Sequence, residues 1–209
     1  VLSTPPQRAE AEEISIRLAE RSAGVYDKAE MHVPIDVAKA AREEALRLGA
    51  DACVAVGGGS TIGLGKAIAL ESGLPIIAVP TTFAGSEMTP IWGLTEDGIK
   101  RTGRDPKVLP TTVVYDPTLT LTLPAFIAGP SGMNAIAHCV EAMYSETANP
   151  IISIIAEEGV RSLARALPII IEQPDNLEAR SEAVYGAYLS GMSLGAVGMA
   201  LHHKLCHTL

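Results

Sequence analysis

Long apolar runs, positive charge and cysteine are all scarce in this sequence of 209 residues. No apolar run reaches the roughly 20 residues that a membrane-spanning helix needs, and no signal-peptide pattern opens the chain. Lysine and arginine number 16 against 24 acidic residues, a formal net charge of −8 that argues against nucleic acid or an anionic membrane as a partner. The three cysteines are widely spaced among apolar neighbours, which favours buried thiols in a reducing cytoplasm over disulfides. We therefore expect a cytoplasmic protein.

Both ends of the sequence resemble interior positions of a longer chain. It opens directly on "VLSTPP", a strand running into a turn, without an initiator methionine. It stops at "LHHKLCHTL", inside an apolar, histidine-bearing helical pattern that has no stop signal. We therefore expect a segment of a longer protein, in which an active site can be incomplete.

The first 123 residues alternate two kinds of segment. Short β-branched runs bounded by Gly, Pro or Asp, typical of buried parallel strands, occupy residues 1–3, 52–56, 75–80 and 111–116. Stretches with helical spacing lie between them, at residues 7–20, 34–49 and 60–72. This alternation predicts an open, right-handed α/β fold with a parallel, Rossmann-like sheet.

Two further patterns complete the expected organisation. "IWGLTEDGIKRTG" interrupts the alternation, and its Asp97-Gly98 turn predicts a hairpin flap. After Pro124 only helical patterns remain. We thus predict an α/β domain over residues 1–123 and the start of an all-α domain over residues 124–209.

The strongest local signal is "CVAVGGGSTIGLGKAIAL", a buried strand that runs through three glycines into a helix. Glycines allow close approach of a ligand to the backbone, and the start of a helix offers free N–H groups to a phosphate. The Gly-x-Gly-x-x-Gly pattern fails at Ile62, and the Walker pattern fails at Ser60 and Ala67. A phosphate loop is therefore the prediction, and a tight turn that binds nothing is the alternative.

A second loop, "PTTFAGSEMTP", follows the next predicted strand and is rich in hydroxyl groups. In an open α/β sheet, ligands bind outside the carboxyl ends of the strands. Two such loops suit a dinucleotide, although hydroxyl side chains in a loop, taken alone, are more often ordinary turn residues.

Asn134, His138 and Glu141 fall on one face of a predicted helix within "SGMNAIAHCVEAMYSE". An Asp-x-x-x-His pair at this spacing would indicate two metal ligands, but the first position here is an amide. The pattern leaves open whether a metal site has lost a ligand or whether the chemistry needs no metal. Glu141 could orient His138 or face solvent.

These motifs together resemble a known family. "GGGS", "PTTFAGSE", "LPAFIAGPSGMNAIAHCVEAMYS" and "GMALHHKLCHTL" occur in the order and at the separations found in the iron-containing alcohol dehydrogenase superfamily. Asn134, the flap and the "HHKLCH" run are most similar to its maleylacetate reductase branch. The resemblance covers the whole chain and implies a strand pair before Val1 and further helical domain after Leu209.

The resemblance implies that the α/β domain binds NADH or NADPH. Thr4 falls where many relatives carry an aspartate for the adenosine ribose, so the phosphate of NADPH would not be repelled. The residues implied in cofactor binding are Thr4, the pyrophosphate loop Gly57, Gly58, Gly59 and Ser60, the second loop Thr81, Thr82, Ser86 and Thr89, the flap residue Lys100, and Leu121 near the nicotinamide.

The resemblance also implies a catalytic role for the helical domain. His138 and His203 match two histidines that bind iron in relatives, Asn134 replaces the aspartate ligand, and His207 matches a histidine near the substrate. A neutral amide makes a much weaker metal site than a carboxylate, so we expect no metal. Local cations must hold a dicarboxylate, and the candidates are His202, His203, Lys204 and Arg101.

The expected function is the NAD(P)H-dependent, metal-independent reduction of maleylacetate to 3-oxoadipate during the degradation of aromatic compounds. Two alternatives remain: a metal-dependent alcohol dehydrogenase of the same superfamily, with iron or zinc, and a nucleotide-binding segment without catalysis. A homodimer is expected from the resemblance alone.

Overall fold

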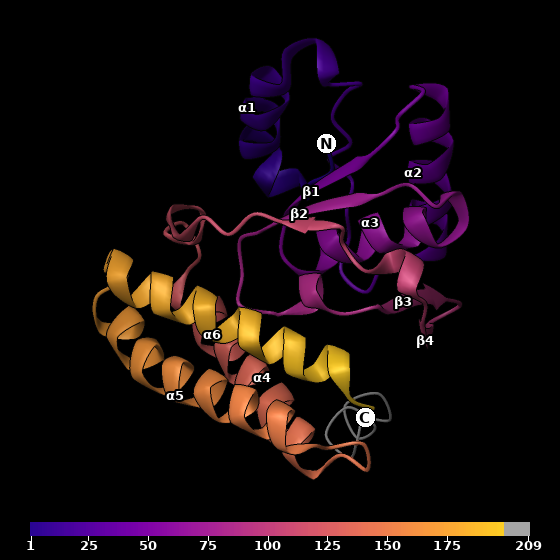
Figure 1. The fold of residues 1–209 in the computed structure, drawn as a ribbon. Helices are drawn as coiled ribbons and strands as arrows, with labels where there is room; N and C mark the ends of the chain where they lie inside the picture. Colours follow the sequence, from indigo (N-terminus) through magenta and orange to yellow (C-terminus); the bar gives the residue numbers. More distant parts are fainter. Residues whose placement is uncertain (199–209) are drawn as a thin grey trace. The chain divides into compact units, whose positions relative to one another are not determined.

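The computed structural model describes residues 1–198, which fold as two compact units (Figure 1). The first unit comprises Val1–Pro80 and Pro90–Val114. The second comprises Thr81–Thr89 and the chain from Tyr115 onwards.

A parallel sheet forms the centre of the first unit. Its strands are β1 (Cys53–Gly57), β2 (Ile76–Pro80) and β5 (Thr112–Val113), in the order β1-β2-β5. Leu2 forms isolated parallel bridges to Ala55 and Tyr26. The predicted α/β fold with a parallel sheet is therefore confirmed, although the predicted first strand is reduced to a bridge.

The helices of this unit follow the predicted periodicity. α3 buries Ile62, Leu64 and Ile68 in two apolar clusters of the unit, and Gly73 ends it in the left-handed conformation at φ 72°. The helical segments of the unit are η1 (Pro5–Gln7), α1 (Arg8–Leu18), η2 (Ala19–Arg21), α2 (Ile35–Arg47), α3 (Gly59–Ser72) and η4 (Pro106–Val108).

The predicted hairpin is also present, formed by β3 (Ile91–Glu96) and β4 (Ile99–Arg104). Asp97 and Gly98 connect the strands with φ values of 51° and 75°. Two successive positive φ values are what a two-residue hairpin turn of type I′ requires. The ammonium of Lys66, buried in α3, donates to the Ile91 carbonyl at 2.8 Å and so attaches the hairpin to the unit.

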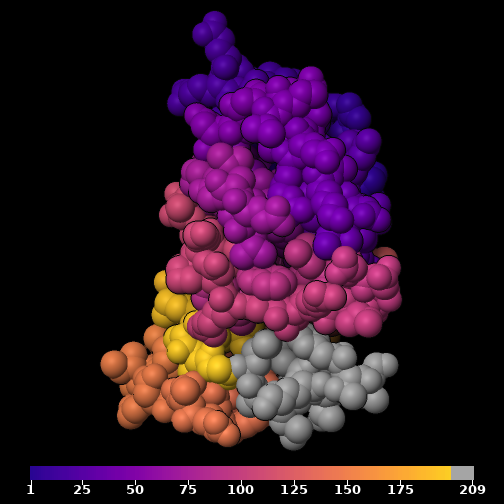
Figure 2. Space-filling view, turned by 90° about the vertical axis from the view of Figure 1, so that its right-hand side faces the viewer, coloured from indigo at the N-terminus to yellow at the C-terminus, as the bar shows by residue number. Residues whose placement is uncertain are grey.

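Up to residue 198, the second unit is built on three long helices, α4 (Ala125–Tyr144), α5 (Pro150–Glu172) and α6 (Leu177–Ala196), which pack on one another. Figure 1 shows α5 in orange beside α6 in yellow, and the same two colours meet at the surface in Figure 2. Two short helical turns, η3 (Ser86–Met88) and η5 (Pro117–Thr120), belong to the same unit. No helix among residues 1–198 is both long enough and apolar enough to cross a membrane.

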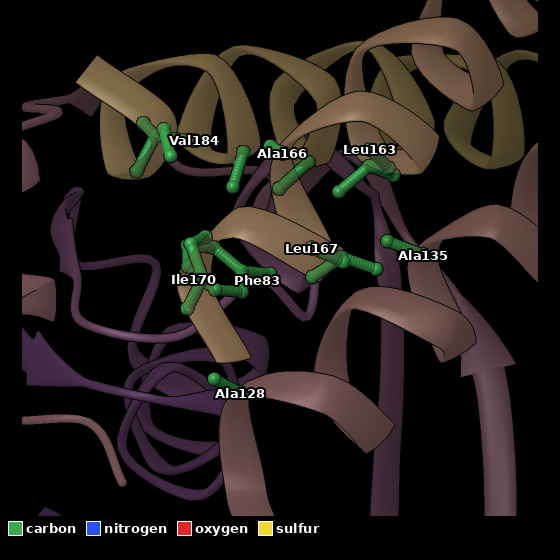
Figure 3. Close-up of a cluster of buried hydrophobic side chains, with 11 residues drawn as sticks. Phe83, Ala128, Ala135, Leu163, Ala166, Leu167, Ile170 and Val184 are labelled. Carbon is green, nitrogen blue, oxygen red and sulfur yellow. The ribbon is translucent and has the colours of Figure 1, made fainter. Parts of the chain in front are cut away.

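The core of the second unit includes one aromatic side chain that does not come from the long helices. Phe83 is fully buried among side chains of α4, α5 and α6, and Figure 3 shows it beside Ile170. Its backbone N–H donates to Ser131 Oγ of α4 at 3.1 Å. Segment Thr81–Thr89 is thus part of the helical unit's core.

The observed division differs from the boundary that the sequence predicts between residues 123 and 124. Thr81–Thr89 and residues 115–123 have their contacts in the helical unit. The physical reason is that Phe83 and the residues after Tyr115 find their apolar and hydrogen-bonding partners on helices that follow much later in the chain. Local periodicity carries no information on such partners.

Glycines let segment Thr81–Thr89 approach α6 at backbone distance. Gly85 has φ 73°, and a Cβ placed on Gly191 would lie 2.1 Å from the Gly85 carbonyl oxygen. A Cβ placed on Gly195 would lie 2.7 Å from the Met88 carbonyl oxygen. These two glycines therefore serve close packing between the segment and α6.

This contact predicts the effect of adding one methyl group. Gly191→Ala should lower the free energy of unfolding by about 1–3 kcal/mol, because the methyl group meets backbone that has no freedom to rotate away. Gly129→Ala is the matched control, since that helical position has its nearest atom, Ile171 Cδ1, at an ordinary 3.6 Å. Urea denaturation of both variants measures the difference, and equal stabilities would contradict the close approach.

Candidate active site

The loop from β1 into α3 has the geometry of an anion site. Gly57 has φ 151°, and a Cβ there would lie 2.4 Å from Thr61 Oγ1. Gly58 is the N-cap of α3, and no side chain caps the helix. The first N–H groups of this 14-residue helix are therefore left to a ligand or solvent, at the end of the helix that favours negative charge.

The surroundings of this loop fit a phosphate group. A Cβ on Gly59 would meet nothing within 4 Å, so there is space above the backbone at this position. The Thr61 hydroxyl is fully buried and finds no hydrogen-bond partner among residues 1–198. The unused N–H groups and the buried hydroxyl can donate hydrogen bonds to the oxygen atoms of a pyrophosphate, and the open space can hold it. Sequence reasoning missed Thr61 as a candidate ligand.

Thr4 lies close to the same loop. Its hydroxyl donates to Gln7 Oε1 at 3.1 Å, and that oxygen lies 2.8 Å from a Cβ placed on Gly57. The structure thus brings Thr4 together with the glycine loop, as a cofactor role for both requires. Lys100 and Arg101 are exposed on β4, where Arg101 pairs with Glu96 at 3.3 Å.

The hydroxyl-rich loop of the second unit is more buried than its composition suggests. Thr81 and Thr89 are 4% and 3% exposed, whereas Thr82 and Ser86 are half-buried. Thr89 Oγ1 donates to the Ser86 carbonyl at 3.1 Å, which is a turn-stabilising role. Thr82 and Ser86 are therefore the more accessible of the four predicted contacts.

A hydrogen bond between the half-buried Tyr115 and the buried Glu87 holds this loop, and sequence reasoning missed it. The Tyr115 hydroxyl donates to Glu87 Oε1 at 2.9 Å, and Glu87 is 1% exposed. Burial, followed by the nearby Glu87 carboxylate, raises the pKa of Tyr115, so the hydroxyl keeps its proton. Tyr188 meets the Tyr115 ring edge-on, with ring centres 6.0 Å apart. The available signal was a single acidic residue within an otherwise uncharged loop.

Asn134 and His138 of α4 form a hydrogen-bonded pair. Asn134 Nδ2 lies 3.0 Å from His138 Nε2, so the amide N–H donates to the ring nitrogen. A ring that accepts at Nε2 carries its proton on Nδ1, which fixes the neutral tautomer. His138 is 5% exposed, whereas Asn134 is exposed and can reach a ligand. The predicted common face of these two residues is confirmed.

Glu141 follows one turn further along α4 and is fully buried. Of the two alternatives that the sequence left open for it, the solvent-facing one is wrong. His138, three residues earlier on the same face of α4, is buried as well.

The Asn134–His138 pair fits a metal ion poorly. Metal ligands donate lone pairs, but the Nε2 lone pair of His138 points to an amide N–H, and the neighbouring ligand position holds a neutral group. Within residues 1–198, no group of three His, Cys, Asp or Glu side chains is arranged to hold a metal. His202, His203, Lys204 and His207 lie outside the described residues.

The two described cysteines offer no reactive thiolate. Cys53 and Cys139 are free and buried, as predicted. Burial raises the pKa of each thiol to about 11, partly opposed at Cys139 by its hydrogen bond with Ser190. Both thiols are therefore protonated near neutral pH. The third, Cys206, lies outside the described residues.

Comparison with known proteins places the chain in a family. Residues 5–117 match the model of the iron-containing alcohol dehydrogenases, and residues 129–209 match the C-terminal model of the Fe-containing alcohol dehydrogenase family. The chain belongs to the iron-containing alcohol dehydrogenase family, as the motif resemblance indicated.

The similar proteins are longer than this chain. It is 60% identical over all 209 residues to a maleylacetate reductase of Burkholderia cepacia, of which it spans 59%. The crystal structure of maleylacetate reductase from Rhizobium sp. strain MTP-10005 matches 99% of the chain with a TM-score of 0.96 and 54% identity, and the chain spans 59% of it. Sulfoacetaldehyde reductase from Bifidobacterium kashiwanohense, solved in complex with NAD+, matches 92% of the chain with a TM-score of 0.83 and 28% identity, over 58% of its own length.

The geometry of Asn134 predicts how one substitution changes metal binding. Asn134→Asp should raise the affinity of the full-length protein for Zn²⁺ or Fe²⁺ at least about tenfold, because a carboxylate replaces a neutral amide and leaves the His138 lone pair free. Anaerobic titration calorimetry measures the change. Asn149→Asp is the control, since Asn149 caps α5 and an aspartate preserves that cap while adding the same charge. Equal metal affinity in wild type and Asn134→Asp would contradict this account of position 134.

Proposed function

We propose that the chain is part of an NAD(P)H-dependent reductase that converts maleylacetate to 3-oxoadipate, in the degradation of aromatic compounds, without a metal. The observation that carries the proposal is the Asn134–His138 hydrogen bond, which puts an amide where a metal site would need an anionic ligand. The identity to maleylacetate reductases over the full chain supports the same substrate. The active enzyme is proposed to be a cytoplasmic homodimer.

Residues 1–123 serve the cofactor in this proposal. The N–H groups at Gly57, Gly58, Gly59 and Ser60 bind the pyrophosphate, with the Thr61 hydroxyl as a further donor. The absence of a carboxylate at Thr4 allows NADPH beside NADH. The NAD+ complex of the similar sulfoacetaldehyde reductase supports a dinucleotide as the cofactor. The remaining proposed contacts are Thr81, Thr82, Ser86, Thr89, Lys100 and Leu121.

Residues 124–209 serve the substrate, whose alkene is conjugated to a ketone. The bound cofactor supplies a hydride. Addition of that hydride to the alkene carbon β to the ketone moves negative charge onto the ketone oxygen, and a proton then enters at the carbon between them. The chain therefore needs hydrogen-bond donors that stabilise the negative charge on the ketone oxygen. It also needs one acid that gives the proton to the carbon.

Asn134 is the proposed donor to the ketone oxygen. Its amide has two N–H groups, of which one donates to His138 and the other remains for the substrate. His138, buried in α4, thereby fixes the direction of the amide. His203 and His207 are the proposed acids, and His202, Lys204 and Arg101 the proposed cations for the two carboxylates.

The proposed activity predicts a direct assay. The purified full-length protein should oxidise NADH when maleylacetate is added, at the same rate with and without EDTA, because the donors are protein groups. Metal content measured by mass spectrometry on the same sample should be well below one per chain. One tightly held metal per chain, with activity lost on its removal, would instead support a metal-dependent alcohol dehydrogenase.

The proposed pyrophosphate loop predicts the effect of a side chain at Gly58. This residue has φ −85° and ψ −160°, a conformation that valine adopts readily, so Gly58→Val should fold. Its side chain would fill the space where the phosphate meets the backbone, so NADH binding should fall below detection. Fluorescence titration measures this, with Gly58→Ala expected to be intermediate. Unchanged NADH affinity in the valine variant would exclude the loop as a phosphate site.

A further inference from the structure

Arg180 is a fully buried cation in α6 whose hydrogen-bond partners are all backbone carbonyls. Nη1 donates to the Thr120 carbonyl, Nη2 to the Leu123 carbonyl at 3.2 Å, and Nε to the Pro174 carbonyl at 3.0 Å. Among the residues that the structure describes, it forms no ion pair. The nearby Asp175 carboxylate offsets only part of the cost of burying this charge, because burial still lowers the pKa of Arg180, and an apolar side chain could fill the same space. The arrangement therefore calls for a reason other than stability.

The two carbonyls of Thr120 and Leu123 are the ends of one tight turn. The Leu123 N–H donates to the Thr120 carbonyl at 3.0 Å, which closes the turn, and Thr120 Oγ1 donates to the Pro117 carbonyl at 2.7 Å. Thr120 is fully buried, whereas Leu121 is half-buried and Thr122 exposed. Arg180 thus holds both ends of the turn with one planar group and leaves residues 121 and 122 facing outward.

The same helix holds a second segment that the proposed function assigns to the cofactor. Gly191 of α6 packs against Gly85, and Gly195 against Met88. Positions 180 and 191 are 11 residues apart on one continuous helix, a rise of roughly 16 Å at 1.5 Å per residue. A rigid helix of the second unit therefore sets the spacing between the turn at 120–123 and segment Thr81–Thr89.

We propose that Arg180 is a positioning residue for the nicotinamide end of the cofactor, acting through the turn Thr120–Leu123. This inference rests on the proposed function, which includes Leu121 among the cofactor contacts, and the family resemblance implies that Leu121 lies near the nicotinamide. The guanidinium touches neither cofactor nor substrate. It keeps the Leu121 backbone at a fixed place on α6, so that the nicotinamide ring is held in the orientation that hydride transfer needs.

The inference predicts that a change at Arg180 weakens binding of the nicotinamide end of the cofactor and leaves binding of the adenosine end unchanged. Arg180→Lys keeps the charge but cannot reach three carbonyls from one ammonium, so the turn should loosen. In the full-length enzyme we expect NADH affinity to fall about tenfold and kcat by about 10–100-fold, while affinity for ADP, which lacks the nicotinamide, stays unchanged. Ser181→Ala is the matched control, because Ser181 is the next residue, is exposed and donates only within α6, to the Leu177 carbonyl.

Thr120→Val removes the hydrogen bond to the Pro117 carbonyl and so loosens the same turn from its other side. This second variant tests the inference if Arg180→Lys does not fold. A rise in the NADH-to-ADP ratio of dissociation constants in either folded variant supports the inference. Equal losses of NADH and ADP affinity, or no loss of either, overturn it and leave Arg180 a structural residue. A wild-type enzyme that binds NADH but does not reduce maleylacetate contradicts the proposed function and not this role of Arg180.

Discussion

The second unit depends on the backbone contact between Gly85 and Gly191. With hydrogen atoms as side chains, a loop that follows strand β2 lies directly on α6, at a distance that no larger residue permits. This contact, together with the burial of Phe83 and its hydrogen bond to Ser131, explains why segment Thr81–Thr89 folds with the helices. The Glu87–Tyr115 hydrogen bond then fixes the loop a second time. A loop held at so many points has a defined shape before any ligand binds.

Much of the fold could be predicted because its signals are local. Strands β1 and β2, helices α1 to α3 and the Asp97-Gly98 hairpin each follow from periodicity and turn chemistry within a short window. The division into units could not be predicted, because it depends on contacts between Phe83 and helices that come at least 40 residues later. Arg180 was also beyond sequence reasoning, since an arginine in a helix is ordinarily exposed and two of its three carbonyl partners lie 57 and 60 residues away.

At the candidate site, the spacing of residues in the sequence predicts which side chains share a helix face, but not which hydrogen bonds they form. The spacing of Asn134 and His138 was enough to place them on one face of α4, but it did not reveal which group donates the hydrogen bond. That direction matters, because an imidazole that accepts from an amide has no lone pair left at that nitrogen for a metal. The orphaned hydroxyl of Thr61 likewise depends on the packing of α3, although its neighbours in the glycine loop were evident from the sequence.

The central claim is that the chain's donors stabilise charge on a ketone oxygen while the hydride enters at the alkene carbon. The product of turnover with NADH carrying deuterium at the transferable position tests this most directly. The account predicts 3-oxoadipate with one deuterium on the former alkene carbon β to the ketone and with the ketone intact, as seen by mass spectrometry and NMR. A deuterated secondary alcohol with the alkene retained would contradict it, since that product requires reduction of the carbonyl itself.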